Sequence, residues 1–231
     1  MTSLAAAVWP ELDGTGLLVV PLGSVEQHGH HLPLATDTAV AGAVADAAAG
    51  ELPGALLAPA LAYGASGEHE GFPGTISLGT EALTGLLVEY GRSACRWTRR
   101  LLVVNGHGGN LDALRAAGGL LRREGRDIAW FPCAVPGADA HAGRSETSLM
   151  LHVEPRGVRT DRSVAGTTTP LAELLPRLRA EGVRAVSPTG VLGDPAGASA
   201  AEGERQLSAL VGRLVEAVRR WDVDASGRLT G

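Results

Sequence analysis

The sequence contains no lysine and very little asparagine. All 20 basic residues are arginines, whereas alanine occupies 37 positions. This bias is typical of GC-rich coding and carries no functional information of its own. The two asparagines of the 231-residue chain both lie in one hexapeptide, NGHGGN at residues 105–110, so this hexapeptide stands out from its background.

Cysteine, basic charge and long apolar runs are also scarce, and each shortage excludes a class of protein. Cys95 and Cys133 are too few for a disulfide framework and predict buried thiols of a cytoplasmic protein. With 25 acidic and 20 basic residues the net charge is -5, which argues against nucleic acid as a partner. The longest uncharged run, residues 52–67, is too short for a membrane span, and residues 1–10 lack the basic start of a secretory signal. We therefore expect neither a nucleic-acid nor a membrane partner.

What is present fits a folded α/β protein, since 45% of the residues are hydrophobic and 19% are charged. Four short apolar runs have strand character, and helical patterns lie between them. The runs are apolar throughout, as in parallel strands buried on both faces. We predict a single domain over residues 1–231 with a three-layer α/β/α fold and a mostly parallel sheet. The strands are expected at residues 17–22, 55–59, 101–105 and 128–131, and the helices at 38–50, 81–98, 111–124, 145–153, 171–181 and 199–221.

Six of the seven histidines lie in the loops that follow the four predicted strands, where open parallel sheets bind ligands. Glu26 and His28 are two residues apart, so in an extended segment both project to one side and can reach one metal centre. Asp37 starts the next helix, where helix capping is an alternative role. Together these carboxylate and imidazole groups suit zinc, manganese or ferrous iron, and Asp37 could bridge two ions.

The other histidine loops carry residues whose roles stay open on spacing alone. His107 lies in the glycine-rich turn after the third strand, and its neighbourhood favours a ligand over a structural histidine. His141 is the candidate for donating a proton to a leaving amine or for stabilising an oxyanion. If Ser145 caps the next helix, Glu146 lies in the first helical turn, where a carboxylate is favourable without any metal.

Further polar residues have weaker claims to the site. Of His30 and His31 at most one can point inward, because neighbours in an extended segment face opposite sides. His152 lies in a predicted helix and is expected to be packed or at the surface. Glu68 and His69 either line the mouth of the site or belong to a turn. The candidate substrate-contacting residues are Glu68, His69 and Asn110.

Four segments together resemble the creatininase family of metal-dependent amidohydrolases. The resemblance implies an α/β/α fold, a two-metal site and a closed homo-oligomer, commonly a hexamer. It also implies metal ligation by four residues, with Asp37 bridging, and a catalytic role for His141. The implied ligands are Glu26, His28, Asp37 and His107, and the segments are GSVEQHGHHLP at 23–33 with Asp37, HEGFPGTIS at 69–77, NGHGGN at 105–110 and HAGRSETS at 141–148.

One position departs from creatininase itself. Creatininase has a glutamate ligand two residues after the histidine of its Asn-Gly-His motif, and this chain has Gly109 there. Other family members with NGHGGN keep the Glu-Thr-Ser found here at residues 146–148, so the resemblance implies Glu146 as the fifth ligand. The departure also weakens the expectation that creatinine is the substrate.

Within the family, the short, alanine-rich and lysine-free chain most resembles the members of the mycofactocin system. These are peptidases that trim a modified ribosomal precursor peptide and release its C-terminal dipeptide, which derives from Val-Tyr and is decarboxylated and cyclised. The resemblance implies a cytoplasmic hydrolase that cleaves a peptide C–N bond with two divalent ions, zinc, ferrous iron or manganese. A creatininase-like enzyme acting on a small cyclic amide or formamide is the alternative, and a metal-binding subunit with an inactive site is another.

Overall fold

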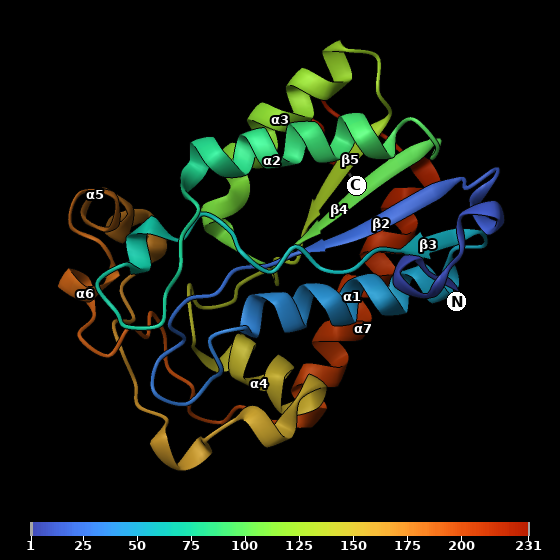
Figure 1. The fold of residues 1–231 in the computed structure, drawn as a ribbon. Helices are drawn as coiled ribbons and strands as arrows, with labels where there is room; N and C mark the ends of the chain where they lie inside the picture. Colours follow the sequence, from blue (N-terminus) through green and yellow to red (C-terminus); the bar gives the residue numbers. More distant parts are fainter. Residues whose placement is uncertain (1, 231) are drawn as a thin grey trace.

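A five-stranded sheet forms the centre of the protein, in a computed structural model that describes residues 2–230. All of its strands are parallel, in the order β1-β3-β2-β4-β5 (Figure 1). Four of them are the predicted strands, whereas the two-residue β1 is too short to leave a pattern in the sequence. The strands are β1 (Thr2–Ser3), β2 (Leu17–Leu22), β3 (Ala55–Leu57), β4 (Arg100–Asn105) and β5 (Ile128–Pro132).

Helices cover both faces of this sheet, which confirms the predicted α/β/α fold. One face carries α2 and α3, which pack against each other, and the other carries α1 and α7, with α4 packed on α7 (Figure 1). The short helices α5 and α6 lie together beyond the carboxyl ends of the strands (Figure 1). The helices are α1 (Thr36–Glu51), α2 (Gly79–Ala94), α3 (Leu111–Arg123), α4 (Arg144–Val153), α5 (Leu171–Glu181), α6 (Val183–Val186) and α7 (Ala200–Arg220).

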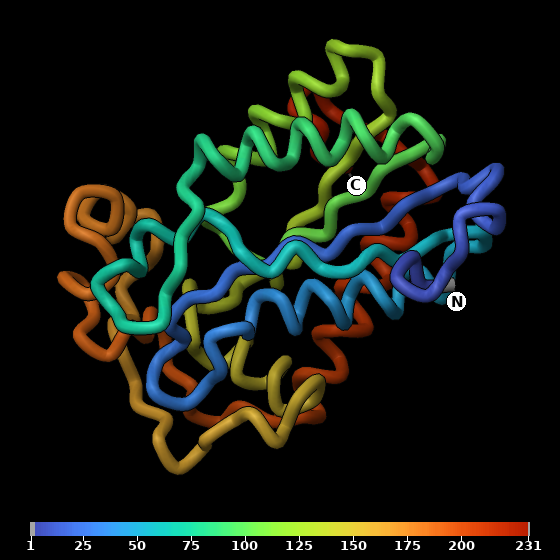
Figure 2. The backbone as a smooth tube through the Cα atoms, viewed as in Figure 1, coloured from blue at the N-terminus to red at the C-terminus, as the bar shows by residue number. Residues whose placement is uncertain are grey.

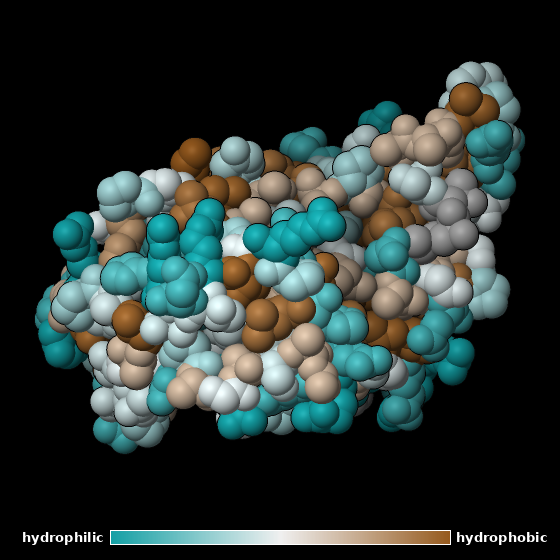
Figure 3. Space-filling model, turned by 90° about the horizontal axis from the view of Figure 1, so that it is seen from below, coloured by the Kyte–Doolittle hydropathy of each residue, from teal (hydrophilic) through white to brown (hydrophobic). Residues whose placement is uncertain are grey.

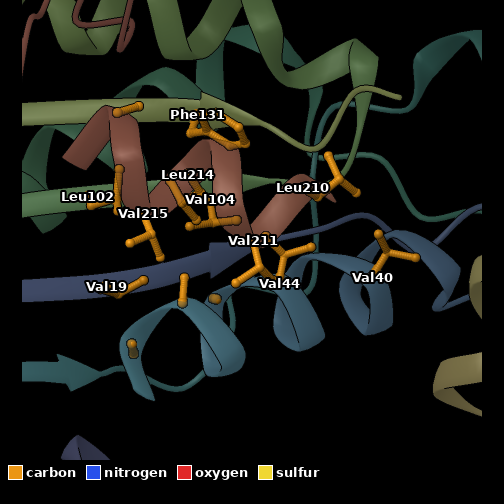
Figure 4. Packing of buried hydrophobic residues seen from close by; sticks show 14 of the residues in the cluster. Val19, Val40, Val44, Leu102, Val104, Phe131, Leu210, Val211, Leu214 and Val215 are labelled. Atoms are coloured by element: carbon orange, nitrogen blue, oxygen red, sulfur yellow. The ribbon is translucent and has the colours of Figure 1, made fainter. Parts of the chain in front are cut away.

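Successive side chains of a strand point to opposite faces of the sheet, so the hydrophobic core has one layer on each face. On β4, Leu102 and Val104 pack toward α1 and α7, whereas Val103 packs toward α2 and α3. Figure 4 shows Val44 of α1 and Leu214 of α7 pointing at the same region of the sheet. Both faces of the central strands are therefore buried, which is why their sequences are apolar throughout.

The strand order reverses between β2 and β4, because the strands that follow these two are added to opposite sides of the sheet. From β2 the chain runs through α1 to β3 on one side, and from β4 through α3 to β5 on the other. Loops leave such neighbouring strands in opposite directions and open a crevice at their carboxyl ends. The loops after β2, β3, β4 and β5 gather at this edge of the sheet (Figure 2).

The two thiols and the surface complete the description. Cys95 and Cys133 are free and half-buried, not fully buried as predicted, because Cys95 ends α2 and Cys133 borders a cavity. On the face seen in Figure 3, apolar side chains are interspersed with polar ones. Across residues 2–230, every helix is too short or too polar to cross a bilayer.

Candidate active site

The loops after four strands bring carboxylates and histidines together at the crevice. The loop after β2 carries Glu26 and His28, and η3 (Gly67–His69), which follows β3, carries His69. His107 lies between β4 and η4 (Gly108–Asn110), and His141 lies between β5 and α4. All five side chains are buried. The structure therefore brings together histidines that are more than 100 residues apart in the sequence.

Asp37 reaches the crevice from the first turn of α1. The helix begins at Thr36 with Ala35 as its N-cap, so the alternative that Asp37 caps the helix is wrong. A Cβ atom at Gly106 would lie less than 3.0 Å from the main-chain oxygen of Asp37. The absence of a side chain at Gly106 thus lets α1 begin directly against the end of β4.

The Asp37 carboxylate lies between two histidines. Its Oδ1 is 3.1 Å from Nε2 of His28, and its Oδ2 is 3.4 Å from Nδ1 of His107. The opposite ring nitrogens are held by carbonyls: His28 Nδ1 donates to Glu26 O at 3.2 Å, and His107 Nε2 donates to Ala65 O at 3.1 Å. When these rings are neutral, the lone pairs of His28 Nε2 and His107 Nδ1 therefore point at Asp37.

Glu26 lies at the centre of a second set of contacts. Its Oε2 is 3.1 Å from His107 Nε2 and accepts a hydrogen bond from the Ser24 hydroxyl at 3.0 Å. Its Oε1 is 3.2 Å from His69 Nε2 and 3.8 Å from His141 Nδ1. One buried carboxylate therefore faces three imidazole rings.

The turn before α4 places Glu146 near the same cluster. The helix begins at Arg144, and the carboxylate of Asp139 accepts hydrogen bonds from the main-chain N–H groups of Arg144 and Ser145. The expected cap by Ser145 is therefore wrong. Glu146 does lie in the first turn, and its Oε2 is 4.0 Å from His28 Nε2.

The residue after His141 has an unusual backbone. Ala142 is fully buried with a φ of 51°, in the left-handed region that an alanine rarely adopts. Its N–H donates to Glu146 Oε2, and the N–H and C=O of His141 both pair with Leu192. These bonds hold the strained turn in place and fix the position of the His141 ring.

Burial and mutual charge shift the pKa values at the centre of the site. Burial raises the pKa of Glu26 to about 7. Burial lowers the pKa of His28, but the adjacent Asp37 carboxylate outweighs it and raises that pKa to about 10. In turn, burial raises the pKa of Asp37, but His28 outweighs it and holds this pKa below its usual value. The Asp37 carboxylate thus favours a positive charge beside it, which a divalent cation can supply as well as a proton.

The pKa values of two other histidines move in the opposite direction. Burial, with the neighbouring His107 and His28, lowers the pKa of His69 to about 3. Burial, with His28 and His69, also lowers the pKa of His141 well below its ordinary value. Both rings are therefore neutral at pH 7, and each carries one proton and one lone pair.

The residues present fit divalent metal ions. Three overlapping groups have ligand atoms within 4.8 Å of one another. Among the described residues, Glu26 Oε1 and Asp37 Oδ2 are buried without a hydrogen-bond partner, an arrangement that is costly unless a cation lies beside them. Nitrogen and carboxylate ligands of this kind suit zinc, manganese and ferrous iron. The groups are Glu26 with His69 and His141, His28 with His141 and Glu146, and Glu26 with His28 and Asp37.

A cavity of about 830 Å³ opens beside this cluster. Asp37, His107 and Glu146 line it, together with the segments 132–140 and 167–171. The volume lies in the upper part of the range for ligand pockets, about 300–1,000 Å³. The cavity therefore has room for a segment of peptide next to the carboxylates and histidines.

The expected substrate contacts have different positions. Glu68 lies at the edge of the cluster, a third exposed, with Oε1 3.5 Å from His107 Nε2. Asn110 is fully buried, and its amide bonds to Ala65 N, Gly23 O and Asn105 Oδ1. These bonds tie three loops together. Glu68, His69 and Asn110 all lie outside the lining of the cavity, so the substrate contacts expected of them stay predictions.

The remaining histidines follow the expectations from alternation. His31 is buried and its Nε2 lies 2.8 Å from the Thr147 hydroxyl, whereas His30 is exposed. Only one of the pair points inward, as predicted. His152 is exposed on α4, which is one of the two positions expected for it.

Two residues contribute more than the sequence indicated. His69, placed at the mouth or in a turn, is buried 3.2 Å from Glu26 Oε1. Gln27 was not singled out, because alternation directs it away from Glu26 and His28. Its amide Nε2 nevertheless lies 2.8 Å from His69 Nδ1, since the η3 loop folds over the other side of this segment. No spacing in the sequence signals this contact.

Known proteins resemble this chain over nearly its whole length. The creatininase family, described as creatinine amidohydrolase, matches residues 5–218. A mycofactocin precursor peptide peptidase of Mycolicibacterium smegmatis is 58% identical over 219 residues, 93% of this chain and 89% of that protein. A creatinine amidohydrolase of Pseudomonas putida is 32% identical over 238 residues, 89% of this chain and 90% of that protein.

Solved structures also match the fold over nearly the whole chain. A structure named Creatininase Mn has a TM-score of 0.79 and 29% identity, covering 95% of this chain and 98% of that one. A mutant creatininase of the Zn-Zn type also has a TM-score of 0.79 with 29% identity, covering 94% of this chain and 97% of that one. The names of these two structures thus record manganese and zinc.

Proposed function

The chain belongs to the creatininase family of amidohydrolases, and we propose that it is a metal-dependent peptidase that hydrolyses a modified ribosomal precursor peptide. Cleavage of one C–N bond releases the C-terminal, Val-Tyr-derived cyclised dipeptide. The relatives named mycofactocin precursor peptide peptidase support this substrate, because they share more than half of their residues with this chain over nearly its full length.

The observation that carries the proposal is the cavity beside Asp37, His107 and Glu146. At about 830 Å³ it accommodates several residues of a peptide, whereas a small cyclic amide would fill only a small part of it. The lower identity to the creatinine amidohydrolase relative also makes the cyclic amide the weaker alternative.

Five residues hold two divalent ions in this proposal, with zinc, ferrous iron or manganese as the metals. Asp37 would be the ligand shared by both ions, a role supported by its two oxygens, which face different histidines. Such ions, when bound, polarise a carbonyl group and lower the pKa of water toward neutrality. Glu26, His28, His107 and Glu146 would supply the other ligands.

His141 moves the proton during hydrolysis. Its Nε2 donates to the main-chain oxygen of Gln27 at 2.7 Å, which leaves the Nδ1 lone pair facing Glu26. Nδ1 accepts a proton from the attacking water and delivers it to the departing nitrogen as the C–N bond breaks. Glu68, His69 and Asn110 are the proposed substrate contacts. The first two are supported by their proximity to the cluster, since Glu68 is partly exposed 3.5 Å from His107 and His69 lies 3.2 Å from Glu26.

We also propose a cytoplasmic location and a closed homo-oligomer such as a hexamer. Both rest on the resemblance of the sequence to its family and on the two free cysteines. The molar mass in solution tests the oligomer directly.

Metal removal tests the chemistry of the site. A strong chelator should abolish cleavage of the modified Val-Tyr-terminated peptide, and zinc or ferrous iron should restore it. His28→Ala and Asp37→Ala should lose bound metal, whereas His141→Ala should keep the metal and lose turnover. His152→Ala, on the exposed side of α4, serves as the control and should keep both. Full activity in the metal-free protein contradicts the proposal.

Parallel incubations test the substrate. The metal-loaded protein should cleave the modified peptide and leave creatinine and a formamide unchanged. Turnover of creatinine or the formamide without turnover of the peptide would support the alternative amidohydrolase. A protein that carries its metals and hydrolyses none of the three would be an inactive metal-binding subunit.

A further inference from the structure

The side chain of Gln27 is buried in a network of polar contacts behind the carboxylate cluster. Its Oε1 accepts a hydrogen bond from the main-chain N–H of Gly29 at 2.8 Å. Its Nε2 lies 2.8 Å from His69 Nδ1, 3.0 Å from His141 Nε2 and 3.1 Å from Gly190 O. Because Oε1 is held by an N–H donor, the orientation of the amide is defined and Nε2 must donate.

The two amide protons can be assigned to two of these three neighbours. His141 Nε2 lies 2.7 Å from Gln27 O, and a carbonyl can only accept, so this ring nitrogen carries a proton of its own. A protonated nitrogen cannot accept from the amide. The amide protons therefore go to His69 Nδ1 and Gly190 O, so both side-chain donors of Gln27 are used.

The same reasoning shows that His69 and His141 present different groups to Glu26: a protonated ring nitrogen in His69 and a lone pair in His141. His69 Nδ1 accepts from Gln27, so the proton of this neutral ring is on Nε2, 3.2 Å from Glu26 Oε1. His141 donates from Nε2, so its lone pair is on Nδ1, 3.8 Å from the same oxygen. We propose that Gln27 is a positioning residue that places the proton of His69 on Nε2 and the lone pair of His141 on Nδ1, the ring nitrogens that lie nearest Glu26 Oε1.

One consequence concerns metal binding. A ring nitrogen that carries a proton cannot ligate a metal, so His69 is excluded as a ligand through Nε2. Of the three groups of candidate ligands, the one formed by Glu26, His69 and His141 is then ruled out, and the groups with Asp37 and Glu146 remain. The Nε2–H of His69 is free to stabilise Glu26 or the oxygen of a scissile carbonyl as negative charge develops on it. This last step rests on the proposed function, whereas the proton positions do not.

Neutron diffraction tests the proton positions directly. In crystals of the perdeuterated, zinc-loaded protein, deuterons should be found on Nε2 of His69 and on Nε2 of His141. A deuteron on Nδ1 of His69, or zinc within ligand distance of its Nε2, overturns the proposal. The result does not depend on any substrate, so it stands or fails separately from the proposed function.

Two variants test the contribution to turnover. Gln27→Glu keeps the acceptor for Gly29 but removes both amide donors, so the His69 proton should move to Nδ1. Gln27→Met removes the donors without adding charge and serves if the glutamate variant does not fold. Both should lower kcat by about 10- to 100-fold while KM and bound metal stay within about threefold of the parent values.

The other glutamine of the chain, Gln206 on α7, provides the control for the proton positions only, because it lines the cavity proposed for the peptide. Gln206→Glu and Gln206→Met should leave the deuteron on His69 Nε2. A Gln27→Met protein that keeps this deuteron and its kcat shows that Gln27 only fills space, and the proposal is then wrong. Parent protein without peptidase activity but with the assigned deuterons refutes the proposed function and leaves the role of Gln27 intact.

Discussion

Replacing Gly109 with alanine should weaken both the fold and the metal site, whereas the same change at Gly108 should weaken neither. A Cβ atom at Gly109 would lie less than 3.0 Å from Ala65 O, His107 Nε2 and Glu68 Oε1. A Cβ atom at Gly108 would meet nothing within 4 Å. Neither glycine has a positive φ, so the difference between the two variants is purely steric.

The magnitude follows from how little the three neighbours can move. Carbon makes favourable contacts at about 3.5–4.0 Å, so each neighbour of Gly109 must shift by roughly half an ångström or more. Ala65 is buried and its N–H is held by Asn110, and the buried His107 ring is held through its Nε2 by Ala65 O. Overpacking of this kind costs about 1–3 kcal/mol. For a chain of this size the cost corresponds to a Tm lower by roughly 2–12 °C.

Thermal unfolding and metal competition measure the two effects. Gly109→Ala should show the lower Tm and, because His107 is displaced, a metal affinity lower by about 10- to 100-fold. Gly108→Ala should keep the parent affinity and change stability by no more than about 1 kcal/mol, in the stabilising direction. Equal Tm and equal metal affinity for the two variants would refute the steric reasoning.

Two further substitutions test buried hydrogen bonds near the site. Asn110→Asp places two carboxylate oxygens where the amide bonded to Ala65 N and Gly23 O, and should cost about 3 kcal/mol or more in urea unfolding; parent stability with a raised KM would instead indicate a substrate contact. Thr147→Val leaves the buried ring of His31 without its hydroxyl partner and should cost about 1–3 kcal/mol in the same assay, whereas Thr147→Ser, which keeps the hydroxyl, should lose less. Equal losses for the valine and serine variants would contradict the importance of the hydrogen bond.

The apolar pattern was sufficient to predict the sheet and its covering helices. Strands buried on both faces need continuous apolar runs, and those runs coincide with β2 to β5 within two residues at their ends. The apolar pattern predicted that the helix α2 continues to residue 98. The helix ends at Ala94, because the backbone of Cys95 is no longer helical before the turn into β4. The elements β1 and α6 are too short to show any period.

The candidate site was predictable where residues share one segment or one motif. Glu26 and His28 project together because alternation is a local property of extended backbone. For Asp37 and Glu146 the local chemistry left two roles open, since a carboxylate in a first helical turn is favourable without a metal. Both residues do lie in a first helical turn, so the metal role of each stays a prediction. The contacts of Asp37 with His28 and His107, which support that role, exist only once α1 lies against β4.

By itself the sequence determined the order of the elements, the family and the loops that carry the polar residues, because each depends on patterns within short stretches of chain. Only the tertiary structure decided which nitrogen of each histidine faces inward. Proton positions on His69 and His141 depend on Gln27, Gly190 and the η3 loop, which lie up to 163 residues apart and meet only in the folded protein. The difference arises because periodicity is encoded along the chain, whereas hydrogen-bond partners at a crevice are supplied by segments that converge from several strands.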